Sequence, residues 1–261
     1  RSWRHMLPFI QRKHLQKRLA ALDLCPLPAP LDLTKAKKVM VFAPHPDDET
    51  LGCGGTLARL AERCDVKVVL VTDGSGAGGL PDGAATTRQR EFQRALARLG
   101  ITDFECLQQP DGAFVGSKIL EHQILKLMRA FQPNWVFMPS PLDYHRDHIR
   151  ISSFVEPLSR RVASVECLLF FEIWAPIPAS HVVDVTDYME TRQAALSEHV
   201  TALACGDYLR AAEGLARYRG LYLGINRMAE AFLVESLEQP SVFHKLQALG
   251  LDVLERMRSG R

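Results

Sequence analysis

The chain has 261 residues, of which 47% are hydrophobic and 24% are charged, a composition typical of a folded globular protein and unlike that of a disordered one. Its 32 basic and 30 acidic residues give a formal net charge of +2, so no overall positive field indicates a nucleic-acid partner. No run of about 18 apolar residues predicts a transmembrane segment. The length favours one large domain, and the lack of a signal-peptide pattern favours a cytoplasmic location.

The six cysteines are scattered along the chain without a CxxC pair. This spacing argues against a zinc ribbon and against a dense disulfide framework. We therefore expect most of them to be reduced, buried and apolar in character. They occupy positions 25, 53, 64, 106, 167 and 205.

The first 38 residues are basic, with nine lysines and arginines against Asp23 and Asp32. Leucines at helical spacing beside basic side chains predict an amphipathic helix, and residues 1–22 would suit contact with an anionic membrane surface. A solvated helix packed on the domain is the alternative. The proline-rich run 25–30 then predicts an extended linker. We expect residues 1–37 to form this helix and linker, and residues 38–261 to form one domain.

From Val39 onward, short apolar runs alternate with longer segments of helical periodicity. The short runs predict strands that are buried on both faces, and the longer segments predict helices. Thr86 and Gln89 are spaced as a capping box near the start of the second helix. The expected strands are 39–43, 66–71, 104–107 and 135–138, and the expected helices are 50–63, 88–99 and 118–131.

This alternation predicts right-handed βαβ units and an α/β fold: a Rossmann-like, doubly wound, mostly parallel sheet with helices on both faces. Beyond residue 149 the pattern predicts a helix, a strand near 165–173 and helices near 190–199 and 242–257, which would form an elaborated C-terminal part. In such sheets ligands bind beyond the carboxyl ends of the strands, where the winding reverses. The residues that follow the first and fourth strands are therefore the candidates for a site.

Histidines and aspartates follow both of these strands. The first runs into Pro44-His45-Pro46-Asp47-Asp48-Glu49, and the fourth runs into Asp143-Tyr144-His145-Arg146-Asp147-His148. A hydrolytic metal centre needs about three imidazole or carboxylate ligands and an open position for water. Two histidines and one of the paired aspartates would supply the ligands, and the other aspartate would act as general base. The extra histidine, His145 or His148, would stabilise a developing oxyanion.

Each of these residues alone has an ordinary structural explanation, because a lone histidine is usually a core or surface imidazole and an aspartate before a helix is usually an N-cap. Two clusters at the ends of neighbouring strands favour a shared site instead. The glycines of 52–55 lack the G-x-G-x-x-G spacing of a dinucleotide-binding oxidoreductase. We expect the remaining histidines without such context to be structural: His122, His181, His199 and His244.

Together the two motifs resemble the paired signature of the PIG-L/LmbE-like N-acetylglucosaminyl de-N-acetylases, which are zinc-dependent deacetylases. Softer similarities extend the resemblance to about residues 38–235. It implies that residues 38–261 form a single Rossmann-like deacetylase domain, a hydrolase acting on an N-acetyl amino sugar. The softer matches are Thr72-Asp73-Gly74, Arg88-Gln89-Arg90-Glu91, Pro110-Asp111-Gly112 and Ala229-Glu230-Ala231-Phe232.

The resemblance also assigns the metal centre. It implies that His45, Asp48 and His148 bind a divalent metal ion, zinc in most of the family, with iron(II) or another divalent ion as the alternative. It further implies that Asp47 is the general base that takes a proton from water.

Four more residues receive roles from the same resemblance. His145 would polarise the acetyl carbonyl, and Asp147 would support the metal ligands from outside. Arg88 and Asp111 would contact the sugar hydroxyls. The segment around His199 resembles the family's C-terminal helix only loosely, because a Ser-Gln pair does not follow this histidine.

The expected substrate is a small amino-sugar conjugate, and the alternative is an inactive carbohydrate-binding protein of the same fold. Asp47 favours the enzyme, because it would serve turnover and not binding. No motif names the oligomeric state or the group attached to the sugar, and a lipid, inositol, a thiol-cofactor precursor, a nucleotide and an antibiotic aglycone are all compatible with the sequence. An anionic group is one hypothesis and solvated surface arginines are the alternative explanation; the residues concerned are Arg210, Arg217, Arg219 and Arg227, together with the basic N-terminal segment.

Overall fold

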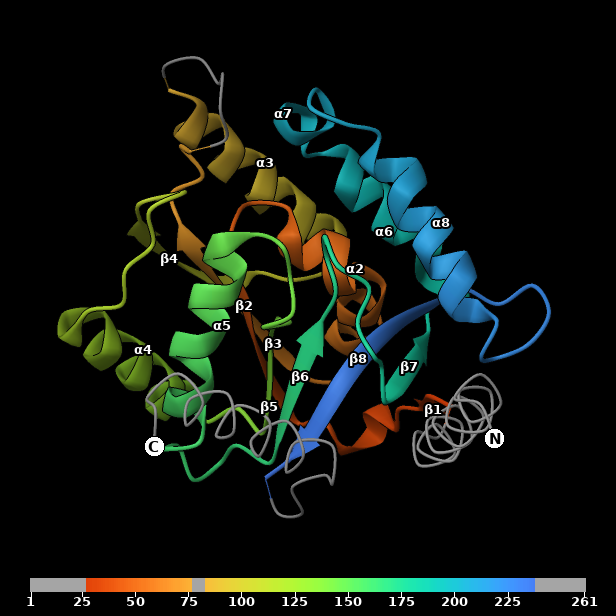
Figure 1. Ribbon diagram of the computed structural model, residues 1–261, viewed down its shortest axis with the longest axis horizontal. Helices are drawn as coiled ribbons and strands as arrows, with labels where there is room; N and C mark the ends of the chain where they lie inside the picture. The colour runs from red at the N-terminus through yellow and green to blue at the C-terminus, as the bar shows by residue number, and fades with distance from the viewer. Residues whose placement is uncertain (1–26, 77–82, 238–261) are drawn as a thin grey trace, which may run out of the picture.

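The computed structural model describes residues 27–76 and 83–237 (Figure 1). In this part of the chain eight strands form one sheet in the order β1-β7-β8-β6-β5-β2-β3-β4. The neighbouring strands are parallel except for β8, which runs antiparallel to both β6 and β7. The strands are β1 (Ala29–Pro30), β2 (Lys38–Ala43), β3 (Asp65–Thr72), β4 (Asp103–Gln109), β5 (Trp135–Pro139), β6 (Cys167–Phe171), β7 (His181–Asp184) and β8 (Ala229–Ser236).

Helices cover both faces of the sheet, as expected for a doubly wound α/β fold (Figure 1). On one face lie α4 (Lys118–Phe131) and α5 (Arg146–Ser159). The other face packs against α2 (Asp48–Ala61), α3 (Ala84–Arg98), α6 (Met189–Ser197) and α8 (Tyr208–Gly220). The remaining helices are the short α7 (Val200–Leu203) and the 3-10 turns η2 (Leu33–Lys35) and η3 (Thr186–Tyr188).

Strand β2 shows why the predicted strands are continuous apolar runs. Val39 and Val41 point into the hydrophobic core under α2 and α3, whereas Met40 and Phe42 point into the core under α4 and α5. Successive side chains of a strand face opposite sides of the sheet, so a strand covered on both faces needs apolar residues at every position.

The strands and helices predicted between residues 38 and 140 match the structure to within a few residues, and the predicted strand near 165–173 and helix near 190–199 correspond to β6 and α6. The capping box is wrong: α3 begins at Ala84 with Gly83 at the N-cap, so Thr86 already lies within the helix. The described C-terminal part also contains β7, β8, α7 and α8, which the periodicity did not reveal.

Some predictions fall where the structure gives no description. The helix expected at 242–257 and the membrane-facing helix at 1–22 lie outside the described residues. Among the described helices, none has the length and apolar character needed to span a membrane. The division of the chain at residue 37 and the cytoplasmic location stay predictions.

The cysteines only partly follow the expectation. Cys53, Cys64, Cys106 and Cys205 are free, and Cys53 is fully buried as expected. Cys64, Cys106 and Cys167 are half-buried and Cys205 is exposed, so the prediction that most cysteines are buried is wrong for the described residues.

Helix α2 is kinked at Cys53, where φ is −151° and ψ is 20°. Glu230 of β8 reaches this kink and accepts hydrogen bonds from the backbone N–H groups of Gly55 (2.8 Å) and Thr56 (2.7 Å). The carboxylate satisfies donors that the kink leaves free and faces the positive end of the second half of α2. It thereby holds the first half of this helix, which carries Asp48, beyond the end of β2.

We expect Glu230→Ala to lower the free energy of unfolding by about 3–5 kcal/mol. The Arg192 guanidinium, only 3.2 Å from Glu230, would be left buried without this carboxylate. Urea denaturation measures the effect. Glu213→Ala is the control, because the exposed pair of Glu213 with Arg217 should contribute at most about 1 kcal/mol. Equal losses in the two variants would show that Glu230 has no special role.

Candidate metal centre

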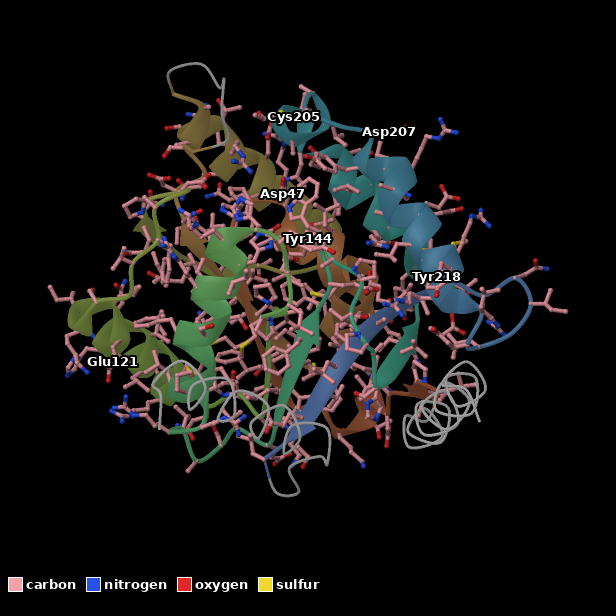
Figure 2. All side chains as sticks on the ribbon, viewed as in Figure 1. Asp47, Glu121, Tyr144, Cys205, Asp207 and Tyr218 are labelled. Carbon is pink, nitrogen blue, oxygen red and sulfur yellow. The ribbon has the colours of Figure 1, made fainter. Side chains whose placement is uncertain are left out.

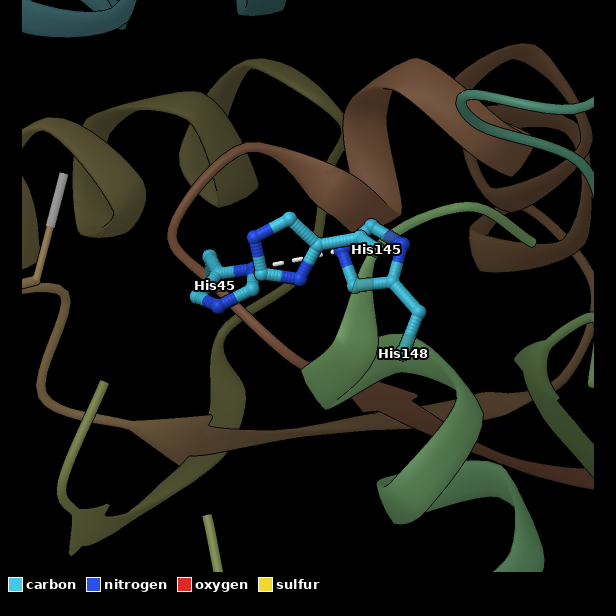
Figure 3. Close-up of side chains that lie close together, drawn as sticks. All are labelled: His45, His145 and His148. Carbon is cyan, nitrogen blue, oxygen red and sulfur yellow. Dashed lines mark hydrogen bonds between the residues drawn. The ribbon is translucent and has the colours of Figure 1, made fainter. Parts of the chain in front are cut away.

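The two histidine-rich motifs meet at one end of the sheet. Strands β2 and β5 are neighbours and parallel, so their carboxyl ends lie side by side, as expected. His45 comes from the loop between β2 and α2, and His145 and His148 come from the start of α5 (Figure 3). Figure 2 shows Asp47 at this same end of the sheet.

Three donor atoms converge there: Nδ1 of His45, Oδ2 of Asp48 and Nε2 of His148. The distance from His45 to Asp48 is 3.0 Å, that from His45 to His148 is 3.2 Å, and that from His148 to Asp48 is 3.1 Å. All three side chains are buried. Tetrahedral zinc with bonds of about 2.1 Å places its ligand atoms about 3.4 Å apart, so this triangle is close to the size that one small cation needs.

Two other donor sets also lie within 4.8 Å: His45 with His145 and His148, and His45 with Asp111 and Asp147. In the second set, the carboxylates of Asp111 and Asp147 face Nε2 of His45, the ring nitrogen opposite Nδ1. Nε2 lies 3.0 Å from Asp111 and 3.6 Å from Asp147, at ion-pair distance but without hydrogen-bond alignment. These carboxylates favour a proton on Nε2, which leaves the Nδ1 lone pair free for a metal ion.

Asp147 is itself fixed by the backbone. It accepts hydrogen bonds from the N–H groups of Gly112 (2.7 Å) and Phe114 (3.4 Å) and has no exposed side-chain surface. The structure thus places Asp147 beside the expected ligand His45, in a position to orient it.

Asp143 lies beside the imidazole of His148 in the same way, although the sequence had suggested no role for it. Its Oδ2 lies 3.4 Å from Nδ1 of His148. Its oxygens also accept hydrogen bonds from the backbone N–H groups of His145 (2.8 Å) and Trp174 (3.1 Å). A histidine that binds a metal ion usually contacts a carboxylate through its other nitrogen, and this rule could have identified Asp143 within the motif.

The electrostatics of the centre fit a cation. Burial favours the neutral form of His148, but Asp48 and Asp143 outweigh it and raise the pKa of this imidazole to about 9. Burial opposes the charged form of His45 too, yet contacts with Asp111 and Asp147 raise its pKa. The negative field that draws protons to these nitrogens also attracts a divalent cation, which would compete with the protons.

Asp47 directly precedes the expected ligand Asp48, and its carboxylate lies 3.6 Å from the Arg88 guanidinium, at ion-pair distance. It holds the N-cap position of α2, yet its side chain makes no capping hydrogen bond. Its φ of 139° is unusual for a residue with a side chain, and such a conformation costs on the order of 1–3 kcal/mol. Burial and the neighbouring Asp48 carboxylate raise the pKa of Asp47 to about 7, a value suited to a general base.

His145 is placed to donate a hydrogen bond. Its Nδ1 accepts from the backbone N–H of Asp147 at 3.3 Å, so the proton of the neutral ring is on Nε2. Its ring centroid lies 4.7 Å from that of His45 and 4.6 Å from that of His148. Burial and these two imidazoles lower the pKa of His145, which keeps it neutral. A neutral imidazole with a free N–H can stabilise an oxyanion.

A cavity of about 700 Å³, its open mouth included, lies over the centre, and we call it the catalytic cavity. Arg88 and Asp111 both line it. The Arg88 side chain is not a surface group: it is 7% exposed and donates to the carbonyls of Gly74 (2.8 Å) and Pro46 (3.4 Å). Another part of the lining comes from the chain after β6 and from the region around α7 and α8, where no motif identified the individual side chains; it consists of Trp174, Thr201, Ala202, Cys205 and Tyr208.

His199 and the four late arginines have structural partners, whereas His244 lies outside the described residues. His199 is buried, with Nε2 3.4 Å from the Thr50 hydroxyl and 3.6 Å from Glu49, and it does not line the catalytic cavity. The four arginines that suggested an anionic substrate each pair with a carboxylate within 4.0 Å, which argues against these arginines as partners of an anionic group. The pairs are Arg210 with Asp207, Arg217 with Glu213, Arg219 with Glu172 and Arg227 with Asp184. The basic N-terminal segment, on which the hypothesis also rested, lies largely outside the described residues.

Comparison with known proteins agrees with this geometry. The family model described as PIG-L, GlcNAc-PI de-N-acetylase, matches residues 40–159. The diacetylchitobiose deacetylase of Thermococcus kodakarensis is 31% identical over 189 residues, which are 62% of this chain and 69% of that protein.

Two solved structures show the same architecture. The conserved protein TT1542 of Thermus thermophilus superposes with a TM-score of 0.66 and 28% identity, over 78% of this chain and 95% of that one. The N,N'-diacetylchitobiose deacetylase of Pyrococcus horikoshii superposes with a TM-score of 0.68 and 22% identity, over 94% of this chain and 98% of the other.

Proposed function

Because this chain belongs to the PIG-L/LmbE family of deacetylases, we propose that it removes the acetyl group from an N-acetylglucosamine-type conjugate. The products are acetate and a free amino sugar. One observation carries the proposal: the triangle of His45, Asp48 and His148 lies directly beside Asp47. A protein that only binds sugars has no use for a buried carboxylate in a strained backbone next to a metal site.

We propose that His45, Asp48 and His148 hold one divalent metal ion. Two imidazoles and a carboxylate form a donor set suited to zinc, and iron(II) is the alternative. When bound, such an ion lowers the pKa of water and polarises the acetyl carbonyl. Asp147 and Asp143 orient the two imidazoles from outside the donor set.

The chain's own groups supply the proton transfers. Asp47 takes a proton from the attacking water as the water oxygen bonds to the acetyl carbon. Nε2–H of His145 donates a hydrogen bond to the carbonyl oxygen while negative charge develops on it. Asp47 then returns the proton to the amide nitrogen, the C–N bond breaks, and acetate and the amine leave. The proton count balances, because water is consumed and no other reactant is needed.

Arg88 and Asp111 are the proposed sugar-binding residues. Both line the catalytic cavity, and the distance from Arg88 Nη1 to Asp111 Oδ2 is 3.6 Å. The pair presents a donor and an acceptor to neighbouring hydroxyl groups. Asp111 also faces His45, so it would link sugar binding to the orientation of a metal ligand.

Acetate release tests the proposed function. The purified protein is incubated with a panel of N-acetyl amino-sugar conjugates, with and without a chelator, and acetate is quantified. We expect release from at least one conjugate, and we expect chelation to stop it. Sugar binding without chelator-sensitive release across the panel would support the inactive carbohydrate-binding protein instead.

We expect His145→Ala to lower kcat by about 10²–10³-fold, the usual effect of removing one oxyanion donor. The bound metal should stay near one equivalent, as measured by elemental analysis. His122→Ala is the control, since this histidine is exposed on α4 and contacts only its own helix. Loss of metal from the His145 variant would contradict this role and make His145 a ligand.

A further inference from the structure

A second hollow opens beside the catalytic cavity and has about 520 Å³ of space, its open mouth included. The two hollows share Leu51, Trp174 and Tyr208 in their linings, so they adjoin each other. Apart from Leu51 of α2, the lining of the second hollow comes from the chain after β6 and from α8, and we call this hollow the α8 groove. Besides the shared residues, its lining consists of Glu172, Ile173, Ala211, Ala212 and Leu215.

The α8 groove presents almost no polar groups to a ligand. Glu172 is its one charged residue, and both of its oxygens are already bonded. The Arg219 guanidinium donates to them at 2.8 and 2.5 Å, and the backbone N–H of Ile177 donates at 2.9 Å. A second sugar ring would find few partners for its hydroxyl groups there, whereas an apolar group would release water from an apolar surface.

Trp174 forms the border between the groove and the catalytic cavity. It is 50% exposed, and its ring meets that of Tyr208 edge to face with centroids 5.8 Å apart. Its backbone N–H donates to Asp143, the carboxylate that also contacts His148. This exposed aromatic surface is therefore held at a fixed position relative to the proposed metal ligands.

We propose that the α8 groove binds an apolar alkyl or aryl group attached to the amino sugar. This inference rests on the deacetylase function proposed above. When the acetamide of the substrate lies in the catalytic cavity, the group attached to the sugar reaches the groove across Leu51 and Trp174. The one charged side chain in the groove lining, Glu172, is already paired. The Glu172 carboxylate, which neutralises Arg219, also disfavours an anionic group.

The test compares kcat/KM for octyl, methyl and disaccharide substrates. We expect octyl N-acetylglucosaminide to exceed the methyl glycoside by about tenfold or more, because several CH₂ groups become buried. Ala211→Trp, which fills the groove, should abolish this preference. Arg210→Trp adds the same side chain at the neighbouring exposed position, outside both linings, and should retain it. A preference for diacetylchitobiose over the octyl glycoside would overturn the proposal in favour of a second sugar.

Binding of octyl glucoside separates this proposal from the proposed function, because it has no acetamide to hydrolyse. Calorimetry below its micelle-forming concentration should detect binding that Ala211→Trp weakens and Arg210→Trp does not. Such binding without turnover of any N-acetyl substrate would support the proposed groove and contradict the proposed deacetylase function. Equal turnover of the octyl and methyl glycosides would reject the groove and keep the deacetylase. Neither binding nor turnover would reject both.

Discussion

Asp47→Asn should lower kcat for acetate release by about 10²–10³-fold while the protein keeps one equivalent of metal ion. The amide cannot accept a proton from water, so the general base is lost. The fold should be retained for two reasons. Asparagine tolerates a positive φ better than most residues, and the Asp47 side chain makes no capping bond that the change would remove.

Asp207→Asn is the matched control for this substitution. Asp207 also holds an N-cap position, at the start of α8, but it does not line the catalytic cavity. Asparagine caps a helix as well as aspartate does, so this variant should keep full activity. Normal turnover by the Asp47 variant would mean that another group takes the proton. Loss of metal from it would mean that Asp47 is itself a ligand.

The core of the fold could be predicted because its strands are buried on both faces. In β2 and β5 every residue from Val39 to Ala43 and from Trp135 to Met138 is buried, so the local sequence alone marks each strand. The site followed from the same fact. Polar side chains directly after such strands have no local reason to be there, and neighbouring parallel strands bring them together.

The C-terminal strands could not be predicted in this way, because distant residues stabilise them. Strand β8 contains two buried glutamates that break the apolar pattern: Glu230 and Glu235. Glu230 is stabilised by Arg192 and by the kink in α2, and Glu235 contacts Arg160 of the chain after α5. Both arginines are far from β8 in the sequence, so the local sequence of the strand does not reveal these partners.

The individual side chains that line the catalytic cavity after β6 could not be identified, for a related reason. Trp174 follows β6, Cys205 follows α7 and Tyr208 begins α8, and none of them belongs to a motif with a defined spacing. For the arginines of α8, the sequence suggested a binding role that their ion pairs argue against. Their positive charge is evident in the sequence, but the carboxylates that neutralise it become apparent only in the folded chain, as the pair of Arg219 with Glu172 shows.

His148→Ala should reduce bound metal from about one equivalent to nearly none, and acetate release should fall with it. The change removes one of three donors and leaves the buried Asp48 carboxylate with one imidazole in place of two. Elemental analysis of the purified variant measures the loss, and circular dichroism checks that the variant is folded.

Asp143→Ala distinguishes a metal ligand from a residue that supports one. Asp143 contacts His148 only through the nitrogen that faces away from the donor triangle, so its removal should weaken metal affinity by about 10–100-fold without abolishing binding. Added zinc should therefore restore acetate release in the Asp143 variant but not in the His148 variant. If added zinc restored acetate release only in the His148 variant, the assignment of His148 as a ligand would be contradicted. A metal ion that binds normally without the His148 imidazole does not use this imidazole as a ligand.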